Sequence, residues 1–198
     1  MSIFSNPLSD PWLQRWLPLA VSHAGEGPVL EIGCGHGDDT AVLADAGLKV
    51  TAFDLSAASV AVARARVPSA SFERRDIRDP FPLADHQAGL VVASLSLHYF
   101  GWEETVAIVQ RIHRALQPGG LLLCRLNSTE DHHFGASGHQ EIEPNFFLVN
   151  GEPKRFFDEA AVKLLFANGW RCLSLEHRVT RKYIKSKAVW EVVLVREA

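Results

Sequence analysis

The chain is poor in cysteine, has no excess of positive charge and contains no long apolar run. Its three cysteines, Cys34, Cys124 and Cys172, form no C-x-x-C pair, so we expect reduced, buried thiols of a cytoplasmic protein and neither disulfides nor a zinc site. The formal net charge of -3 argues against a nucleic-acid partner, because binding a phosphate backbone needs clustered Lys and Arg. No apolar run has membrane-spanning length and no basic segment precedes Arg15, so the sequence predicts neither a membrane anchor nor a secretory signal.

The composition that is present is that of one globular domain. Apolar residues make up 47% and charged residues 22% of the 198 positions, which is typical of soluble globular proteins and not of disordered or fibrous chains. This length suffices for one full core and is short for two. We therefore expect a single domain over residues 1–198. Nothing in the sequence predicts an oligomeric state.

The segment around which the chain is organised is Val29 to Asp39, with the sequence VLEIGCGHGDD. An apolar strand leads directly into Gly33, Gly35 and Gly37 and then into a helix expected over residues 40–46, which is how an open α/β sheet builds a nucleotide-sized crevice. The spacing is G-x-G-x-G, whereas a dinucleotide fingerprint is G-x-G-x-x-G. Asp38 and Asp39 would also face a diphosphate with two negative charges. The loop therefore favours a ligand with positive charge and no phosphate, such as S-adenosylmethionine.

Residues Glu31 to Gly37, EIGCGHG, resemble motif I of the class I (Rossmann-like) S-adenosylmethionine-dependent methyltransferases, in which an acidic residue precedes G-x-G-x-G. The resemblance runs from about Val29 to the C-terminus and is strongest over Val29 to Leu126. It implies an α/β fold, a doubly wound, seven-stranded, mostly parallel sheet with an antiparallel last strand in three α/β/α layers. It also implies S-adenosyl-L-methionine as the cofactor and in-line methyl transfer to a small-molecule acceptor. Residues 141–159 look most like the small bacterial methyltransferases of the tellurite-resistance type.

Acidic residues end the next two expected strands. Asp54 lies about twenty residues after the first glycine, where a carboxylate can accept both hydroxyls of a ribose; capping the helix over residues 57–67 is left to Ser56. In the resemblance, Asp76 accepts from the adenine amino group, and Ile77 and Leu55 cover the two faces of the ring. The complete set of expected cofactor residues is Glu31, Gly33, Cys34, Gly35, Gly37, Asp54, Leu55, Asp76, Ile77 and Ser94.

The acceptor is expected at the end of the buried strand over residues 88–95. His98 and Tyr99 follow this strand, and catalytic groups concentrate in loops at the carboxyl ends of parallel strands, although both could be ordinary packed residues. If the accepting atom must lose a proton, the available general bases are His98, Tyr99, His132 and His133.

Residues 127–156 interrupt the α/β alternation. We interpret them as a substrate lid whose aromatic side chains exclude water, with an insertion packed on the sheet edge as the alternative. The segment holds His132, His133 and His139, but no metal site is expected because their spacing matches no known ligand pattern.

The N-terminal residues 1–28 are expected to form a helical cap. Asp10 and Pro11 have the pattern of an N-cap followed by proline at the first helical position. Trp12 and Trp16 share one face of the helix with leucines 13 and 17, which indicates packing on the sheet edge. The alternative, taken from many class I methyltransferases, is that this helix also covers the cofactor.

The C-terminal part continues the sheet. We expect a helix over 102–116, a strand over 121–126, a helix from the cap Asp158 through 166, and two strands over 172–177 and 189–195. The connection between the last two strands is basic, through Arg178, Arg181, Lys182, Lys185 and Lys187. A solvated edge that discourages aggregation explains these charges, and an anion site is the alternative.

Two other functional classes fit parts of this pattern. A nicotinamide-dependent oxidoreductase shares the type of fold but not the glycine spacing. A non-catalytic protein that binds S-adenosylmethionine to regulate a partner would keep the cofactor residues and differ in the lid.

Overall fold

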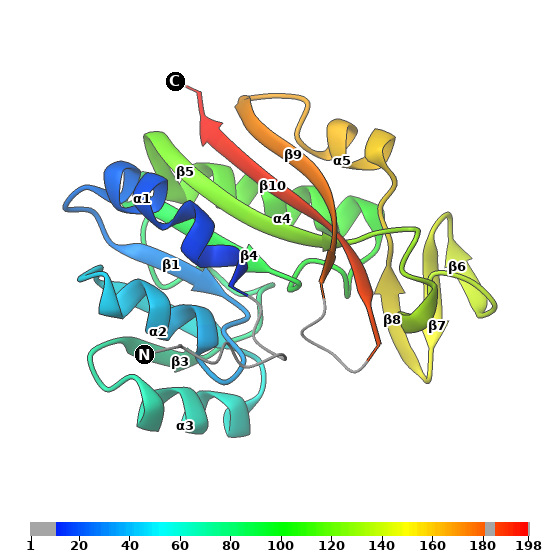
Figure 1. Ribbon diagram of the computed structural model, residues 1–198, viewed down its shortest axis with the longest axis horizontal. Coiled ribbons are helices and arrows are strands. Elements are labelled where there is room, and N and C mark those ends of the chain that lie inside the picture. Colours follow the sequence, from blue (N-terminus) through cyan, green and yellow to red (C-terminus); the bar gives the residue numbers. More distant parts are fainter. Residues whose placement is uncertain (1–10, 181–184, 198) are drawn as a thin grey trace, which may run out of the picture.

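The computed structural model describes residues 11–180 and 185–197, which form a seven-stranded sheet flanked by helices and a separate three-stranded sheet (Figure 1). The strand order of the large sheet is β3-β2-β1-β4-β5-β10-β9. Its strands are β1 (Val29–Ile32), β2 (Val50–Asp54), β3 (Ser71–Arg74), β4 (Ala88–Ser94), β5 (Leu116–Asn127), β9 (Trp170–Thr180) and β10 (Lys187–Arg196). The first five strands pair in parallel, and β10 pairs antiparallel with both β5 and β9. The expected antiparallel last strand is thereby confirmed.

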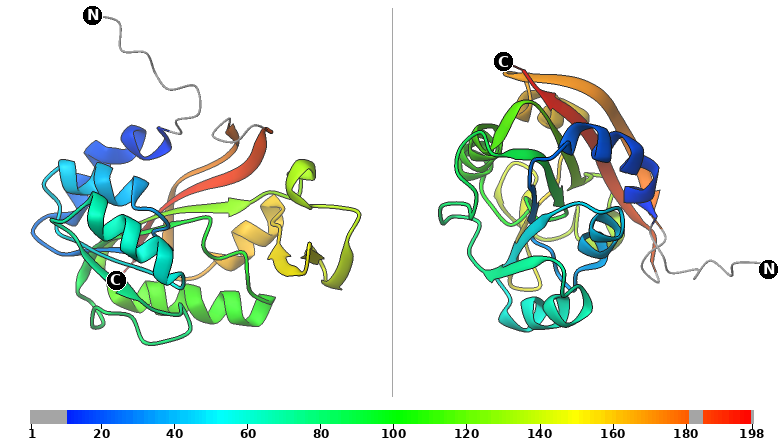
Figure 2. Two further views of the ribbon diagram at one scale, coloured as in Figure 1. Left: turned by 90° about the horizontal axis from the view of Figure 1, so that it is seen from below. Right: turned by 90° about the vertical axis from the view of Figure 1, so that its left-hand side faces the viewer.

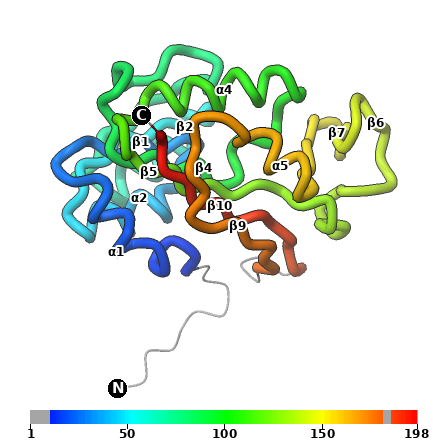
Figure 3. The backbone as a smooth tube through the Cα atoms, turned by 90° about the horizontal axis from the view of Figure 1, so that it is seen from above, coloured from blue at the N-terminus to red at the C-terminus, as the bar shows by residue number. Residues whose placement is uncertain are grey.

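Helices cover both faces of the large sheet, which confirms the three layers. The helices are α1 (Trp12–Ala24), α2 (Asp38–Asp45), α3 (Ala57–Arg66), α4 (Trp102–Ala115) and α5 (Glu159–Leu165). Alternation along β4 shows how the layers form: Leu90 and Val92 belong to the cluster under α1, α2 and α3, whereas Val91 belongs to the cluster under α4 and α5. Figure 3 shows α4 on one side of the strands and α1 and α2 on the other. A strand buried on both faces in this way needs a nearly continuous apolar sequence.

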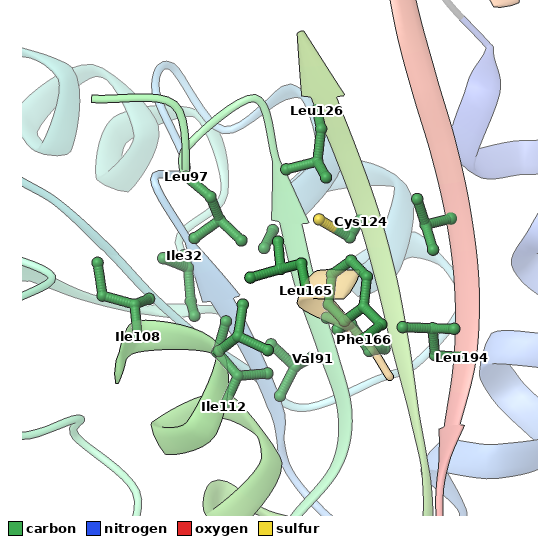
Figure 4. Close-up of a cluster of buried hydrophobic side chains, with 14 of the residues drawn as sticks. Ile32, Val91, Leu97, Ile108, Ile112, Cys124, Leu126, Leu165, Phe166 and Leu194 are labelled. Atoms are coloured by element: carbon green, nitrogen blue, oxygen red, sulfur yellow. The ribbon is translucent and has the colours of Figure 1, made fainter. Parts of the chain in front are cut away.

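The cluster under α4 and α5 holds the largest connected set of buried apolar side chains. Figure 4 shows Ile112 of α4 beside Val91 of the sheet, and Leu165 and Phe166 near the strand that carries Cys124. Burying a side chain of this size stabilises the fold by about 1.5–3 kcal/mol. This layer therefore fixes the loops that leave the carboxyl ends of the strands.

Local sequence signals set most helix ends. The Ser56 hydroxyl accepts from the Ser59 N–H at 3.2 Å, and the Asp158 carboxylate accepts from the Ala161 N–H at 2.7 Å, so both expected caps are confirmed. Helix α2 begins two residues earlier than expected, because Gly37 takes the N-cap position at φ +79°. Strand β5 begins at Leu116, before the expected residue 121, with a register shift against β4. The expected cap at Asp10 lies outside the described residues, and Pro11 occupies the N-cap position of α1.

The segment expected to be an irregular lid contains the small antiparallel sheet. Its strands are β6 (Gln140–Glu143), β7 (Phe146–Val149) and β8 (Glu152–Arg155), and a short 3-10 turn, η1 (His132–Phe134), precedes them. Asn145 and Asn150 adopt positive φ values of 58° and 53°, which asparagine tolerates in the tight turns between such strands. Figures 1 and 2 show this sheet at one end of the molecule, beyond the carboxyl end of β5.

Two expectations about exposure are wrong. Cys172 is exposed, because it lies on the edge strand β9, whereas Cys34 and Cys124 are buried as expected. Lys187 is not part of a solvated edge: it is buried and its Nζ lies 2.8 Å from Asp131 Oδ2. Of the other basic residues in this connection, Arg181 and Lys182 lie outside the described residues. Within the described ranges, no helix is long and apolar enough to cross a membrane.

Candidate active site

A cavity of about 670 Å³ opens at the carboxyl ends of β1, β2, β3 and β4, and residues of β8 complete its wall. The volume lies within the range of small-molecule sites, roughly 300–1,000 Å³. The wall consists of Ile32, Gly33, Gly35, Phe53, Asp54, Leu55, Ser56, Arg75, Asp76, Ile77, Arg78, Leu95, Ser96, Tyr99, Phe100, Glu152 and Pro153. This is the edge at which open α/β sheets bind their ligands.

The three glycines of the loop after β1 have different physical roles. A Cβ on Gly33 would lie 2.6 Å from the Cβ of Ser96, and a Cβ on Gly37 would lie 3.1 Å from that of Ala63. These two glycines allow the loop to pack against its neighbours. A Cβ on Gly35 would meet no atom within 4 Å, and Gly35 lines the cavity at φ +52°. Its missing side chain therefore leaves room for a ligand to approach the backbone.

Asp54 links the glycine loop to the start of α3. Its Oδ2 accepts from the Gly35 N–H and its Oδ1 from the Ser56 N–H, both at 2.9 Å. Each carboxylate oxygen can accept a further hydrogen bond. The carboxylate is thus fixed in orientation and still able to accept two donors from a ligand, which suits a ribose diol.

Asp76 lies in the turn after β3, next to the end of β2 that carries Asp54. Its Oδ1 accepts from the Arg78 N–H at 2.9 Å, and the Arg78 side chain reaches Oδ2 at 3.3 Å. The same guanidinium donates to Glu104 at 2.6 Å and lies 4.8 Å from the centre of the Phe100 ring. Ile77 is buried in the cavity wall, and Leu55 is largely exposed. This side of the cavity therefore combines an acceptor with apolar surfaces, as a nucleobase requires.

The turn after β4 contains a backbone feature that the sequence did not reveal. Leu95 adopts φ +56°, a conformation that costs a residue other than glycine about 1–3 kcal/mol. Its N–H donates to the Arg125 carbonyl at 2.9 Å, which holds the turn against β5. Leu95 and Ser96 line the cavity as a result, so the strain occurs where the chain meets the ligand space.

The four candidate general bases fall in different places. Tyr99 lines the cavity and is 45% exposed. The His98 ring stacks on it at 4.1 Å but is only 6% exposed and does not line the cavity. Burial, together with Lys187 and Lys154, lowers the pKa of His98 to about 3. His132 and His133 are exposed on η1, outside the cavity wall.

Glu31 is also absent from the cavity wall. It is buried, and its Oε2 accepts from the Thr40 hydroxyl at 2.5 Å. Burial raises its pKa well above the usual value, and Asp39 raises it further. Cys34, Gly37 and Ser94 likewise lie behind the wall, and burial raises the pKa of Cys34 to about 12. Over the described ranges, no group of three His, Cys, Asp or Glu side chains could hold a metal ion.

A buried arginine fastens the small sheet to the turn after β4. Arg155 is 3% exposed; its backbone N–H donates to the His98 carbonyl at 2.7 Å and its Nε to the Phe100 carbonyl at 3.0 Å. Its guanidinium pairs with Glu143 at 2.6 Å, and Glu143 also accepts from the Trp102 N–H at 3.0 Å. These contacts place Glu152 and Pro153 of β8 at the cavity wall. Local sequence patterns contain no signal for them.

Other residues of the wall were also missed from the sequence. Arg75 and Arg78 flank the predicted Asp76, so their proximity was available from spacing alone. Ser96 and Phe100 follow β4 beside the predicted residues 94, 98 and 99.

Known proteins resemble this chain in sequence and in fold. Residues 29–120 match the family model of methyltransferase domains. Trans-aconitate 2-methyltransferase of Paracidovorax citrulli is 37% identical over 100 residues, which are 50% of this chain and 38% of that protein. An uncharacterized methyltransferase of Synechocystis sp. is 31% identical over 151 residues, and the match covers 71% of each chain.

Among solved structures, a SAM-dependent methyltransferase from Methanosarcina mazei has the same fold, with a TM-score of 0.76 at 19% identity over 91% of this chain and 97% of that one. The chain spans less than two fifths of the length of the trans-aconitate enzyme. The placement among tellurite-resistance-type proteins stays a prediction. The match over 71% of the Synechocystis relative, with this fold, shows that the chain belongs to the class I S-adenosylmethionine-dependent methyltransferase family.

Proposed function

We propose that this protein binds S-adenosyl-L-methionine in the 670 Å³ cavity and transfers its methyl group to a small-molecule acceptor. The observation that carries the proposal is the convergence of Gly35, Asp54 and Asp76 on one cavity from three different strand ends. In the proposal Asp54 accepts from the ribose hydroxyls and Asp76 from the adenine amino group, with Ile77 and Leu55 against the ring. Gly33, Gly35 and Gly37 let the loop approach the amino-acid part of the cofactor.

The protein's contribution to the reaction is alignment and exclusion of water. A sulfonium is an excellent leaving group, so the acceptor needs mainly to be held in line with the methyl carbon. Tyr99 is the one of the four candidate bases that lines the cavity. The small sheet and η1 together serve as the lid over the acceptor. The proposed location is the cytoplasm, where the free thiols of Cys34, Cys124 and Cys172 would stay reduced.

A sheet variant tests the catalytic part of the proposal. We expect Pro153→Gly to lower methyl transfer several-fold and to weaken binding of S-adenosylhomocysteine to a clearly smaller extent, because Pro153 shapes the β8 side of the wall. Pro118→Gly, at the far end of β5, is the matched control. Full turnover after disruption of the lid would instead favour a non-catalytic role for this segment.

A further inference from the structure

A second hollow lies beside the cofactor cavity. It is a cleft of about 270 Å³ with walls from α1, β5, β9 and β10. Three guanidinium groups line it, those of Arg15, Arg125 and Arg178, together with one carboxylate, Glu191. The basic connection between the last two strands begins at this cleft.

One side-chain hydrogen bond links the cleft to the end of β4, which leads into the cavity wall. Arg125 donates from its Nε to the Ser94 hydroxyl at 2.9 Å, and the next residue, Leu95, lines the cavity. The Arg125 guanidinium lies 4.4 Å from the centre of the Trp12 ring, whose Nε1 donates to Asp39 at 3.0 Å. Trp12 thus connects the cleft to the first turn of α2, which follows the glycine loop near which the amino-acid part of the cofactor is proposed to bind.

The arginines are arranged to receive an anion. Arg125 is 3% exposed and held in orientation by Ser94 and the Trp12 ring. Arg15 and Arg178 both pair with Glu176, at 2.8 Å in the case of Arg178, and Arg15 also pairs with Glu191 at 3.3 Å. The three arginines therefore exceed these two carboxylates by one positive charge. The planar guanidinium fork matches the geometry of a carboxylate and binds it with two parallel hydrogen bonds.

The acid–base character of the site limits the acceptor. Among the described residues that line the cavity or the cleft, none is a histidine, and Tyr99 is the one candidate general base among them. An alcohol or protonated amine must lose a proton to become nucleophilic, which calls for a base. A carboxylic acid is already ionised near neutral pH.

We propose that the acceptor is a carboxylic acid whose carboxylate group is bound by the arginine cleft and methylated to an ester; this rests on the proposed methyl transfer. An oxygen lone pair of the carboxylate forms the new bond to the methyl carbon. The bond from that carbon to sulfur breaks, and its electron pair stays on sulfur. The sulfonium becomes a neutral thioether, the carboxylate becomes a methyl ester, and no proton is transferred.

Mild alkali distinguishes this product from others. The full chain is incubated with S-adenosylmethionine labelled in its methyl group and a deproteinised small-molecule extract of bacterial cells. Alkali hydrolyses methyl esters to methanol but leaves methyl groups on nitrogen, sulfur, carbon or ether oxygen in place. We expect volatile labelled methanol. Alkali-stable label, or no labelled product, overturns the inference.

Calorimetric titration with S-adenosylhomocysteine distinguishes a failure of the carboxylate inference from a failure of the proposed function. If this compound binds and the label is alkali-stable, only the carboxylate inference fails. If it does not bind, the proposed function fails with it.

Two variants of β9 test the role of the cleft. Arg178→Gln should lower the release of methanol about tenfold at limiting extract, since a hydrogen bond between charged groups is lost, and should leave binding of S-adenosylhomocysteine within twofold. Arg171→Gln makes the same change of charge on an exposed residue at the other end of β9 and should alter neither. Equal losses in both variants, or none in Arg178→Gln, contradict the role of the cleft.

Discussion

Glu31 is a buried carboxyl group whose surroundings disfavour its charge. Burial and the neighbouring Asp39 raise its pKa, while the hydrogen bond from Thr40 acts in the opposite direction. A carboxyl group with a raised folded-state pKa binds more protons in the folded than in the unfolded state. Its contribution to the free energy of unfolding is therefore lost as pH rises above the unfolded value of 4.5.

This predicts the behaviour of Glu31→Gln. The amide keeps an oxygen acceptor for Thr40 and removes the ionisable group, so the variant should equal or exceed the wild type in Tm at pH 8. The advantage should shrink as pH falls toward 4.5. Thermal unfolding followed by circular dichroism at both pH values measures the difference. The account is contradicted if the Tm of the variant minus that of the wild type is lower at pH 8 than at pH 4.5.

The pKa of His98 leads to a prediction with the opposite dependence on pH. Burial first, then Lys187 and Lys154, lower its pKa to about 3 from the ordinary 6.5, so the imidazole stays neutral over the physiological range. Its proton NMR signal, assigned with His98→Asn, should not titrate between pH 5 and 8. Since the unfolded state binds a proton on this histidine more readily than the folded state does, the His98 contribution to stability is lost as pH falls from 6.5 toward 3. A midpoint near 6.5 would show that His98 is solvated and available as a base.

Single residues differ in how well the sequence predicts them. The position of Asp54, Gly33 and Gly35 at the cavity was predictable because strand, turn and helix are consecutive in the chain and their spacing carries the geometry. Arg155 was not, because its contact with the Phe100 carbonyl joins residues 55 positions apart. The positive φ of Leu95 was equally hidden, since leucine normally avoids that conformation.

Among the elements, the small sheet depends on one ion pair. Glu143 accepts from the first N–H of α4 and pairs with buried Arg155, and a Cβ on Gly101 would lie 2.7 Å from its Oε1. Removing one partner of a buried pair costs about 3–5 kcal/mol. Glu143 is one-third exposed, so its loss should be smaller because water screens the pair.

We therefore expect Glu143→Ala to lower the free energy of unfolding by about 2 kcal/mol and to speed amide hydrogen exchange over residues 140–155. Gln140→Ala, at an exposed position on the same strand, is the control and should cost under about 1 kcal/mol. Urea denaturation and hydrogen exchange read by mass spectrometry give the two quantities. Unchanged exchange in β8 would show that the ion pair does not hold the small sheet.

Elements were predicted best where periodicity was strong. The apolar run of β4 and the caps at Ser56 and Asp158 indicated the correct elements with small errors at their ends. The strands of the small sheet are only four residues long and mix buried with exposed positions, so they show neither a helical nor a strand period. Their order comes from Arg155, Glu143 and the asparagine turns, which act through tertiary contacts.

For the whole molecule, the sheet topology distinguishes the two interpretations of the glycine loop, a dinucleotide site and an S-adenosylmethionine site. A dinucleotide fold in its usual form continues with a parallel sixth strand, whereas here β10 enters antiparallel between β5 and β9. This arrangement brings Arg125 of β5 and Arg178 of β9 to the same cleft beside the cofactor cavity. The sequence indicated the basic residues but not the sheet register that gathers them.

The most direct test of the central claim is calorimetric titration of the full chain with S-adenosylmethionine, S-adenosylhomocysteine and NAD. We predict micromolar binding of the first two, weakened at least tenfold in Asp54→Ala by loss of two hydrogen bonds to a charged acceptor. Asp45→Ala, an exposed carboxylate at the end of α2, should bind both like the wild type. Binding of NAD alone, or equal affinity in Asp54→Ala and wild type, would contradict the account of the cavity.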